Sequence, residues 1–506
     1  MSVTYTAEQA LAIGARGKTI VSASAGSGKT FVMIEKLVGL ILDEANVTDI
    51  LAVTFTTKAA SQMKEKLKTA LIKKIGDKSI SDEQRKTLKE KLVMLPQADV
   101  STIHSFCSKI IRRYFYLVDV SSDFRILADE AEVKSLQNKA LDLLFEQAYA
   151  DEDEDFYTLL SVYRKKRSER TLRELILSFY EKIRPTRNYR ETLLSARYDE
   201  TSFSETERGL YELYAASFSR RKQKLELLKE ECLDYPVAER FLEDVLSWCN
   251  EVLSGNLFSM REGCFLSLPA KPRRSKKISD AEMEIVDRAG ELKSAMSEFA
   301  KEIRKFGTRE EELETYLASG KIANALASCV LRFDELYAQE KRAKGALDYG
   351  DLEHFALRLL EKQEVVAELK GKYKYVFVDE YQDVNPVQEA ILSAVSGKEV
   401  FLVGDMKQSI YGFRGANSSY FAKKIDEFAR EGNALLLRNN FRSADGILKF
   451  VNDIFEVCMT DETGVDYKST SHMIGGGGYG EHEGRVLLHI LPPEEREEIV
   501  KTAFIP

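Results

Sequence analysis

A segment of small residues near the N-terminus has the composition and spacing of a loop that binds phosphate groups. Residues 23–30 read Ala-Ser-Ala-Gly-Ser-Gly-Lys-Thr and fit the P-loop pattern A-x-x-x-x-G-K-T, with alanine in place of the usual first glycine. Glycines let backbone N–H groups approach phosphate oxygens, Lys29 can reach the β and γ phosphates, and Thr30 can ligate magnesium. The predicted nucleotide site comprises Ala23, Ser24, Ala25, Gly26, Ser27, Gly28, Lys29 and Thr30.

Two adjacent carboxylates supply the second part of a nucleotide-hydrolysis site. Asp379 and Glu380 follow the apolar run 375–378, within the sequence Asp-Glu-Tyr-Gln-Asp. Open α/β sheets bind ligands at the carboxyl ends of their strands, so this position favours a functional role over a solvated turn. Asp379 is predicted to hold magnesium directly or through water, and Glu380 to orient and deprotonate an attacking water. The pair favours a nucleotide hydrolase over a kinase.

A third group of candidate residues lies in two later segments. Gln408 is suited to sensing a γ phosphate, whereas Tyr411 and Phe413 offer flat faces on which unpaired bases can stack. Residues 439–443, Asn-Asn-Phe-Arg-Ser, add another aromatic ring and, at Arg442, a guanidinium that can bind phosphate. Each feature alone would be ordinary for a turn or a core. Because they follow the first two motifs in this order, a functional role for these residues is favoured over a structural one.

Short apolar runs precede these motifs and predict the strands that position them. The runs are residues 19–21, 50–55, 375–378 and 400–403. After the phosphate loop, apolar residues recur at the spacing of one helix face, at Ile34, Leu37, Val38, Ile41 and Leu42. Continuous apolar strands that alternate with helices are typical of a parallel α/β sheet.

A long central stretch has a different composition, because it contains no glycine between Gly76 and Gly209. Within it, apolar residues in 133–148 recur at helical spacing, and charged helical patterns continue in 219–231 and 281–305. We therefore predict that a mostly helical insertion of about 113–345 splits one α/β domain.

Composition and charge exclude several classes of protein. The formal net charge of −8 argues against a protein that coats nucleic acid through bulk positive charge, although it allows a local basic groove. The six cysteines include no C-x-x-C pair, so neither a disulfide framework nor a zinc site is indicated. The apolar runs are too short to cross a bilayer, and the N-terminus lacks a secretory pattern, so a cytoplasmic location without membrane partners is expected.

On these residues the chain resembles superfamily 1 DNA helicases of the UvrD/RecB type. Within that group it is most similar to the N-terminal part of the AddA (RexA) helicase-nuclease subunits. Further matching segments are Thr-Ala-Glu-Gln at 6–9, Thr-Phe-Thr-Thr-Lys-Ala-Ala at 54–60 and Thr-Ile-His-Ser-Phe-Cys at 102–107. The segment Leu-Asp-Tyr-Gly-Asp-Leu-Glu at 347–353 is AddA-like in particular.

The resemblance implies a role for each matched residue. Gln9 is expected to read the adenine, and Phe441 to stack on the base where many relatives have tyrosine. The expected catalytic residues are Lys29, Asp379, Glu380, Gln408 and Arg442, with Thr30 and Asp379 as magnesium ligands. The expected DNA contacts are Phe55, Thr57, His104, Tyr411, Phe413 and Arg414, the last of which would couple nucleotide to DNA. Thr57 stands where the family often has asparagine.

The resemblance also implies an architecture and an activity. The fold expected is α/β, a RecA-like parallel sheet with a P-loop, split by a large all-helical insertion and followed by the start of a second RecA-like lobe. Lobe one would comprise 1–112 and 346–415, the insertion 113–345, and the incomplete second lobe 416–506. With ATP and Mg²⁺ as cofactors, such a protein moves 3′ to 5′ on DNA. The expected partners are single-stranded and tailed duplex DNA and an AddB/RexB-type subunit, in double-strand-break repair and recombination.

Two family features have no counterpart after Arg442. The segment T-x-H-x-x-K-G-L-E and a later arginine-bearing motif are absent, so the chain is expected to be the N-terminal portion of a longer protein. An arginine supplied to the γ phosphate contributes roughly 10³ to 10⁵ in rate, so slow hydrolysis is expected. Nuclease activity is not expected, because Asp-Tyr-Lys at 466–468 resembles a nuclease fragment without its partner carboxylates.

Three alternatives to this reading stay open on the sequence. An ATP-gated DNA-binding or assembly module without productive turnover would need only the first motifs. A stand-alone UvrD-like repair helicase shares them as well, although the long insertion and the 347–353 segment favour the AddA type. A small-molecule kinase explains neither the Gln408 loop nor the 439–443 segment.

Overall fold

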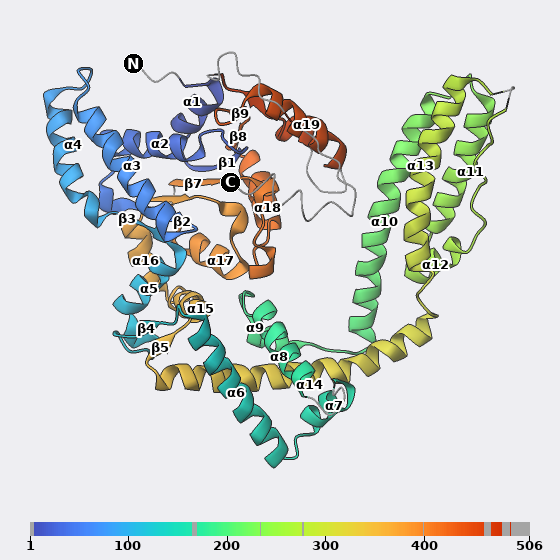
Figure 1. Ribbon diagram of the computed structural model, residues 1–506, viewed down its shortest axis with the longest axis horizontal. Helices are drawn as coiled ribbons and strands as arrows, with labels where there is room; N and C mark the ends of the chain where they lie inside the picture. The colour runs from blue at the N-terminus through green and yellow to red at the C-terminus, as the bar shows by residue number, and fades with distance from the viewer. Residues whose placement is uncertain are drawn as a thin grey trace, which may run out of the picture. The chain divides into compact units, whose positions relative to one another are not determined.

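The chain folds into two compact units, seen in a computed structural model that describes residues 5–163, 169–232, 234–275, 278–397, 399–459, 467–477 and 486 (Figure 1). The first unit comprises Met1–Ala140, Ser178–Tyr189 and Leu336–Pro506. The second comprises Leu141–Leu177 and Arg190–Glu335. All the candidate site residues belong to the first unit.

The first unit is built on a six-stranded parallel sheet in the order β3-β2-β6-β7-β1-β8 (Figure 1). Its strands are β1 (Lys18–Ala23), β2 (Ile50–Thr54), β3 (Asp99–Thr102), β6 (Tyr375–Val378), β7 (Glu399–Gly404) and β8 (Ala434–Leu437). In the register, Ile20 lies opposite Leu402 and Leu402 opposite Val378. The motifs that follow β1, β6 and β7 therefore lie together at the carboxyl ends of these strands.

Helices cover both faces of this sheet, and alternate residues of each strand point to opposite faces. Ile20 and Leu51 belong to one hydrophobic cluster, whereas the adjacent Val21 and Ala52 belong to the other. The helices of the first cluster are α5 (Ile103–Arg113), α15 (Tyr349–Leu359), α16 (Gln363–Lys372), α17 (Pro386–Val395) and α18 (Ser419–Ala429). Those of the second are α1 (Ala7–Gly14), α2 (Lys29–Asp43), α3 (Thr57–Ile75) and α4 (Asp82–Met94). Burial on both faces explains the continuous apolar strands.

The predicted parallel α/β sheet is confirmed, and it extends further along the chain than the sequence pattern indicates. The four predicted strands correspond to β1, β2, β6 and β7, while the polar β3 has no strand pattern in its sequence. The sequence reading places residues 416–506 in a second lobe, yet α18 packs on the first sheet and β8 pairs with β1. The sheet therefore includes β8, which ends at Leu437 and covers the edge of β1. Where a second lobe begins stays a prediction.

The second unit is helical in its described part. Its core is formed by α10 (Glu200–Glu230), α11 (Pro236–Val252), α12 (Leu257–Cys264) and α13 (Asp280–Ile303). The other helices that lie in it or run into it are α6 (Glu130–Ala150), α7 (Glu154–Tyr163), α8 (Arg170–Ile183), α9 (Tyr189–Ser195) and α14 (Arg309–Ala343). The predicted boundaries of the insertion, 113 and 345, stay a prediction.

The remaining elements of the first unit are short or peripheral. They are β4 (Arg125–Ile126), which pairs with β5 (Ala346–Leu347), β9 (Asn439–Asn440), which pairs with β10 (Ile474–Gly475), α19 (Asp445–Cys458) and α20 (Tyr467–Thr470). In the part of the chain that the structure describes, no helix is both long and apolar enough to cross a membrane.

Leu51 provides a test of the sheet as the core of the first unit. Its side chain is fully buried in β2, so Leu51→Ala is expected to cost about 3 kcal/mol of unfolding free energy through lost burial and the cavity left behind. Urea denaturation followed by circular dichroism measures this. Leu11→Ala, at a position 64% exposed on α1, is the matched control and should change stability by less than about 0.5 kcal/mol. Equal effects of the two substitutions would contradict the described core.

Candidate nucleotide-binding site and adjoining aromatic pocket

The phosphate loop joins the end of β1 to the start of α2. Gly26 and Gly28 adopt φ angles of +72° and +85°, the left-handed region that favours glycine. Gly28 is the N-cap of α2 and no side chain caps that helix, so backbone N–H groups of its first turn are open to a ligand. The loop therefore has the backbone form of an anion site at a helix N-terminus.

A cavity of about 550 Å³ lies beside this loop and collects many of the predicted residues. It is lined by Gly26, Gly28, Lys29, Thr30, Phe31, Lys66, Glu380, Phe441 and Arg442. Phosphate-loop, acidic-motif and 439–443 residues thus face one space. The described residues that line it include one carboxylate and three cationic side chains, as a bound polyphosphate requires.

The acidic motif reaches the phosphate loop through an ion pair. Lys29 Nζ lies 3.1 Å from Glu380 Oε2. Burial, and then the charge of Glu380, raise the pKa of Asp379 to about 6, although Lys29 and Lys66 act in the opposite direction. A buried carboxylate with a raised pKa favours a nearby cation, and a carboxylate with a threonine hydroxyl is a ligand set that Mg²⁺ accepts beside phosphates. Thr30 lines the cavity, whereas Asp379 is not among its described lining residues, so their shared metal role stays a prediction.

Glu380 also has an unusual backbone conformation. Its φ of +53° is left-handed, which is uncommon for a residue with a side chain and costs of the order of 1–3 kcal/mol. The strain turns the chain sharply after β6 and directs the Glu380 carboxylate toward Lys29. Such strain is a recurrent feature of functional sites.

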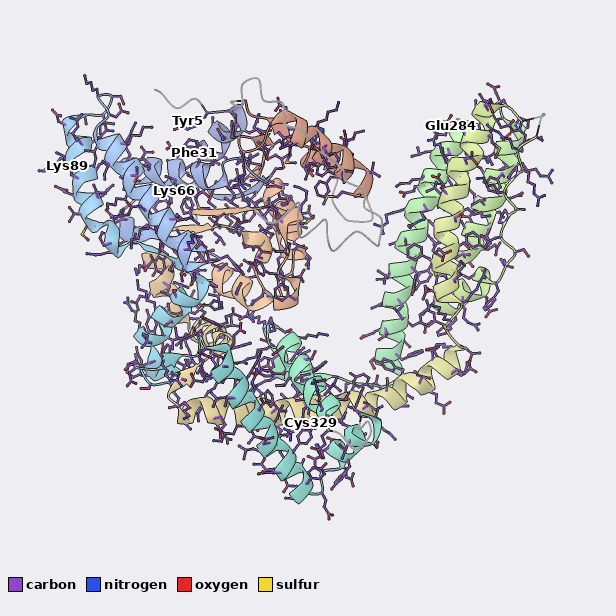
Figure 2. All side chains as sticks on the ribbon, viewed as in Figure 1. Tyr5, Phe31, Lys66, Lys89, Glu284 and Cys329 are labelled. Atoms are coloured by element: carbon purple, nitrogen blue, oxygen red, sulfur yellow. The ribbon has the colours of Figure 1, made fainter. Side chains whose placement is uncertain are left out.

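Gln9 contacts the phosphate loop from α1. Its Nε2 donates to the Ser27 carbonyl at 3.3 Å, and its Oε1 accepts from the Thr6 backbone N–H at the start of the helix. The side chain is buried. Nearby, Tyr5 packs on Phe31 with ring centroids 5.9 Å apart (Figure 2). The adenine role of Gln9 stays a prediction.

Asn440 fastens the 439–443 segment to the phosphate loop. Its Nδ2 donates to the Ala25 carbonyl at 2.6 Å, and its Oδ1 accepts from the Arg442 and Ser443 backbone N–H groups at 2.8 Å. The Phe441 N–H donates to the Gly26 carbonyl at 2.9 Å. A side chain at Gly26 would place its Cβ 2.7 Å from the Arg442 Cβ, so glycine is required here for this close approach.

Sequence reasoning missed two residues of this site. The motif reading gives Asn440 no role, although an asparagine before a turn commonly accepts from backbone N–H groups two and three residues later. Lys66, on α3, lines the cavity, and its charge acts on Asp379 (Figure 2). No pattern distinguishes Lys66 from the other lysines of α3, because only the position of the helix brings it to the cavity.

Gln408 lies outside the residues that line this cavity. Its Nε2 donates to Asp405 Oδ2 at 2.6 Å, just after β7. Asp405 also pairs with Lys407 at 2.7 Å. The γ-phosphate role of Gln408 stays a prediction.

Three of the predicted DNA-contacting residues form one aromatic group. Phe55 and Tyr411 stack with centroids 4.5 Å apart and planes at 27°, and Tyr411 and Phe413 lie 5.9 Å apart. Phe413 is 79% exposed. Thr57 begins α3, two residues after Phe55. The Arg414 side chain lies outside the described residues, so its predicted role stays a prediction.

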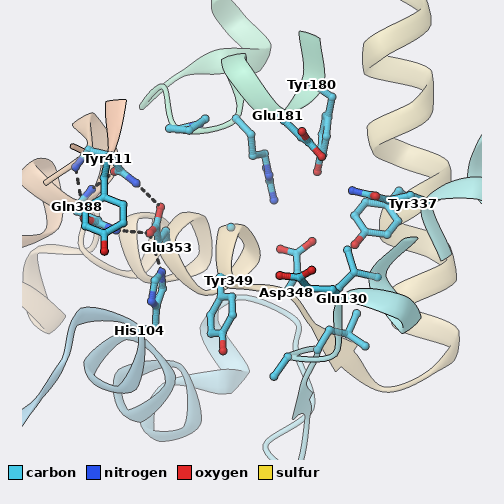
Figure 3. A pocket seen from close by; sticks show the side chains of 18 of the residues that line it. His104, Glu130, Tyr180, Glu181, Tyr337, Asp348, Tyr349, Glu353, Gln388 and Tyr411 are labelled. Atoms are coloured by element: carbon cyan, nitrogen blue, oxygen red, sulfur yellow. Dashed lines mark hydrogen bonds and ion pairs between the residues drawn. The ribbon is translucent and has the colours of Figure 1, made fainter. Parts of the chain in front are cut away.

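A second cavity of about 550 Å³, the aromatic pocket, adjoins this group (Figure 3). Its lining includes Phe55, His104, Tyr349, Glu353, Asp383 and Tyr411. His104 Nε2 lies 2.9 Å from Glu353 Oε1, which also accepts from Gln388, and the His104 ring packs on Tyr349. Burial raises the pKa of Glu353, but hydrogen bonds from His104, Gln388 and Asn385 outweigh burial and lower it.

The acidic residues of the 347–353 segment are used inside the fold. Asp348 and Asp351 both pair with the buried Lys341, and Asp351 also pairs with Arg184 at 2.8 Å. Asp348 caps α15 by accepting from the Asp351 N–H. This ion cluster holds the helix that carries Glu353.

Comparison with known proteins identifies the family of the chain. The family model described as UvrD/REP helicase N-terminal domain matches residues 4–429. The chain belongs to this family. It is 32% identical over 93% of its length to an ATP-dependent helicase/nuclease subunit of the AddA type from Alkaliphilus oremlandii, and 33% identical over 95% to the corresponding protein of Desulforamulus reducens. The predicted resemblance is thereby confirmed.

The match covers only part of those relatives. The chain spans 41% of the Alkaliphilus oremlandii protein and 42% of a protein of the same name from Pelotomaculum thermopropionicum, to which it is 32% identical. The activity of a complete relative is therefore only a proposal for this chain.

Asn440→Ala tests whether the hydrogen bonds between the 439–443 segment and the phosphate loop position the nucleotide residues. Loss of the amide leaves the Ala25 carbonyl and two N–H groups without their partner, which costs about 1–3 kcal/mol. Nucleotide affinity, measured with a fluorescent ATP analogue, is expected to fall about tenfold. The neighbouring Asn439→Ala should leave affinity within about twofold, since its side chain points to the other side of β9. Unchanged affinity in Asn440→Ala would remove the positioning role.

Proposed function

We propose that this chain is the ATP-driven motor segment of a DNA helicase that moves 3′ to 5′ on single-stranded DNA and acts in double-strand-break repair and recombination. The supporting observation is that Lys29, Glu380 and Arg442 face one cavity while Phe55 and Tyr411 stack beside another. The family match and the names of the relatives support the same function.

At the nucleotide cavity, each residue has a chemical task. Backbone N–H groups of the phosphate loop and Lys29 bind the phosphates of ATP, and Phe441 at the rim stacks on the base. Glu380 accepts the proton of the attacking water. Thr30 and Asp379 would hold magnesium, which would supply charge neutralisation at the phosphates.

Hydrolysis by this chain alone is slow. Arg442 is the one guanidinium among the described residues that line the cavity, and a second arginine at the γ phosphate commonly contributes roughly 10³ to 10⁵ in rate. Lys66 adds a positive charge there but lacks the planar fork that binds phosphate oxygens in pairs.

The DNA strand lies on the aromatic group, where Phe55, Tyr411 and Phe413 stack on successive bases. His104 binds the strand beside them. The relatives are named as one subunit of a helicase/nuclease, which supports assembly with another polypeptide, and we propose that it is of the AddB/RexB type. The proposed location is the cytoplasm.

A second candidate is an ATP-gated DNA-binding module without productive turnover. The observation that favours it is Gln408, which is bonded to Asp405 and lies outside the lining of the nucleotide cavity. A third, the stand-alone repair helicase, predicts unwinding by this chain without any other polypeptide.

Steady-state ATP hydrolysis by the purified chain, with and without single-stranded DNA, distinguishes the motor from the module. We expect a slow reaction that DNA stimulates about tenfold or more and that Lys29→Ala abolishes, because Lys29 binds the transferred phosphate. Lys68→Ala, an exposed lysine of α3, is the matched control and should behave as wild type. Bound nucleotide without DNA-stimulated turnover would favour the module. A turnover equal to that of complete relatives would contradict slow hydrolysis.

The direction of movement is tested on tailed duplexes. Strand separation is expected on a duplex with a 3′ single-stranded tail and not on one with a 5′ tail, in a reaction that requires ATP. Replacement of Tyr411 by alanine should reduce the rate at least about tenfold, since stacking contributes roughly 1–3 kcal/mol for each base. Phe115→Ala, at an exposed aromatic outside both cavities, is its control. Preference for the 5′ tail would overturn the proposed polarity.

A further inference from the structure

The side-chain amide of Gln382 lies between the two cavities and is fully hydrogen-bonded. One Nε2 hydrogen points to Glu380 Oε2 at 3.0 Å and the other to Asp383 Oδ2 at 3.1 Å. Its Oε1 accepts from the Asp405 backbone N–H at 2.9 Å. Gln382 is 2% exposed, so water does not compete for these bonds.

These partners determine the orientation of the amide. Rotation by 180° would place the amide oxygen against two carboxylates and the NH₂ group against the Asp405 N–H, so all three contacts would become repulsive. The strand end leaves room for this side chain because residue 404 is glycine. A Cβ at Gly404 would lie 2.5 Å from Gln382 Oε1.

The two carboxylates that the amide joins face different spaces. Glu380 lines the nucleotide cavity beside Lys29, whereas Asp383 lines the aromatic pocket with Phe55 and Tyr411. Burial, and then the charge of Glu380, raise the pKa of Asp383. One amide group therefore contacts one wall residue of each cavity.

The same residue is connected to the segment that carries Gln408 and Tyr411. Ser409 Oγ donates to the Gln382 carbonyl at 3.2 Å, and Asp405, whose N–H the amide accepts, holds Gln408. The 405–411 segment is thus connected by hydrogen bonds to Gln382, and through its amide to Glu380.

We propose that Gln382 is a positioning residue that couples occupancy of the aromatic pocket to the orientation of Glu380 at the nucleotide. This inference rests on the proposed function, because it takes ATP and single-stranded DNA as the two ligands. It assigns the coupling to a buried side chain that touches neither ligand.

The test measures whether each ligand changes the affinity of the chain for the other. Anisotropy of a fluorescent oligothymidine gives DNA affinity with and without a non-hydrolysable ATP analogue and Mg²⁺. Coupling between sites commonly amounts to about fivefold or more in affinity, and we expect at least this for wild type. Gln382→Met keeps the length of the side chain and removes its polar atoms. In this variant the change in DNA affinity caused by the ATP analogue should fall below about twofold, while each ligand alone binds as in wild type.

Two further variants separate coupling from folding. Gly404→Ala pushes the Gln382 amide away without altering it, and should also remove the coupling. Asn452→Leu removes another buried amide, in α19, that makes three hydrogen bonds, and should retain the coupling. Thermal unfolding of each variant reports whether the fold is retained.

The outcomes distinguish this inference from the proposed function. The inference is overturned if coupling persists in Gln382→Met or is absent from wild type. Neither result bears on whether DNA stimulates ATP hydrolysis. Absence of DNA-stimulated hydrolysis in wild type overturns the proposed motor. That result would not affect the measured coupling between the two ligands or the dependence of this coupling on Gln382.

Discussion

The contact between Lys29 and Glu380 is the interaction on which the site depends. The two residues are 351 positions apart in the chain, yet their side chains lie 3.1 Å from each other. They meet because β7 pairs with both β1 and β6 in parallel, which brings the carboxyl ends of all three strands to one edge of the sheet. The phosphate loop follows β1 and the acidic motif follows β6, so both lie at this end of the sheet.

Two buried amide side chains near that end of the sheet, Gln382 and Asn440, each make several hydrogen bonds to neighbouring segments. Unpaired polar groups in such a place would cost free energy, whereas a fully satisfied network holds its members in one arrangement. Gln382 donates to one oxygen of each of two carboxylates and accepts from a backbone N–H, and Asn440 donates to a carbonyl and accepts from two N–H groups. The left-handed backbone of Glu380 is retained against its steric cost by these surroundings. The Gln382 amide thus links Glu380, which lines the nucleotide cavity, to Asp383, which lines the aromatic pocket.

Much of this arrangement was predictable from local pattern. The apolar runs before the phosphate loop, the acidic motif and Gln408 indicated parallel strands, since strands buried on both faces must be apolar throughout. The spacing of glycines and Lys29 indicated the phosphate loop. Elements without such a pattern were missed. The polar β3 lies at a sheet edge, and β8 belongs to a stretch that sequence reasoning places in a second lobe.

The sequence by itself determined which residues could do the chemistry, because residue type and spacing along one strand-turn-helix unit are local properties. Only the tertiary structure decided which of them meet. It brought Lys66 to the nucleotide cavity, stacked Phe55 on Tyr411, placed the acids of the 347–353 segment in an internal ion cluster, and set Gln382 between two carboxylates. The physical reason is that these contacts join segments that are distant in the chain. Strand order and helix packing bring such segments together, and neither strand order nor helix packing produces a periodic pattern in the sequence of the residues concerned.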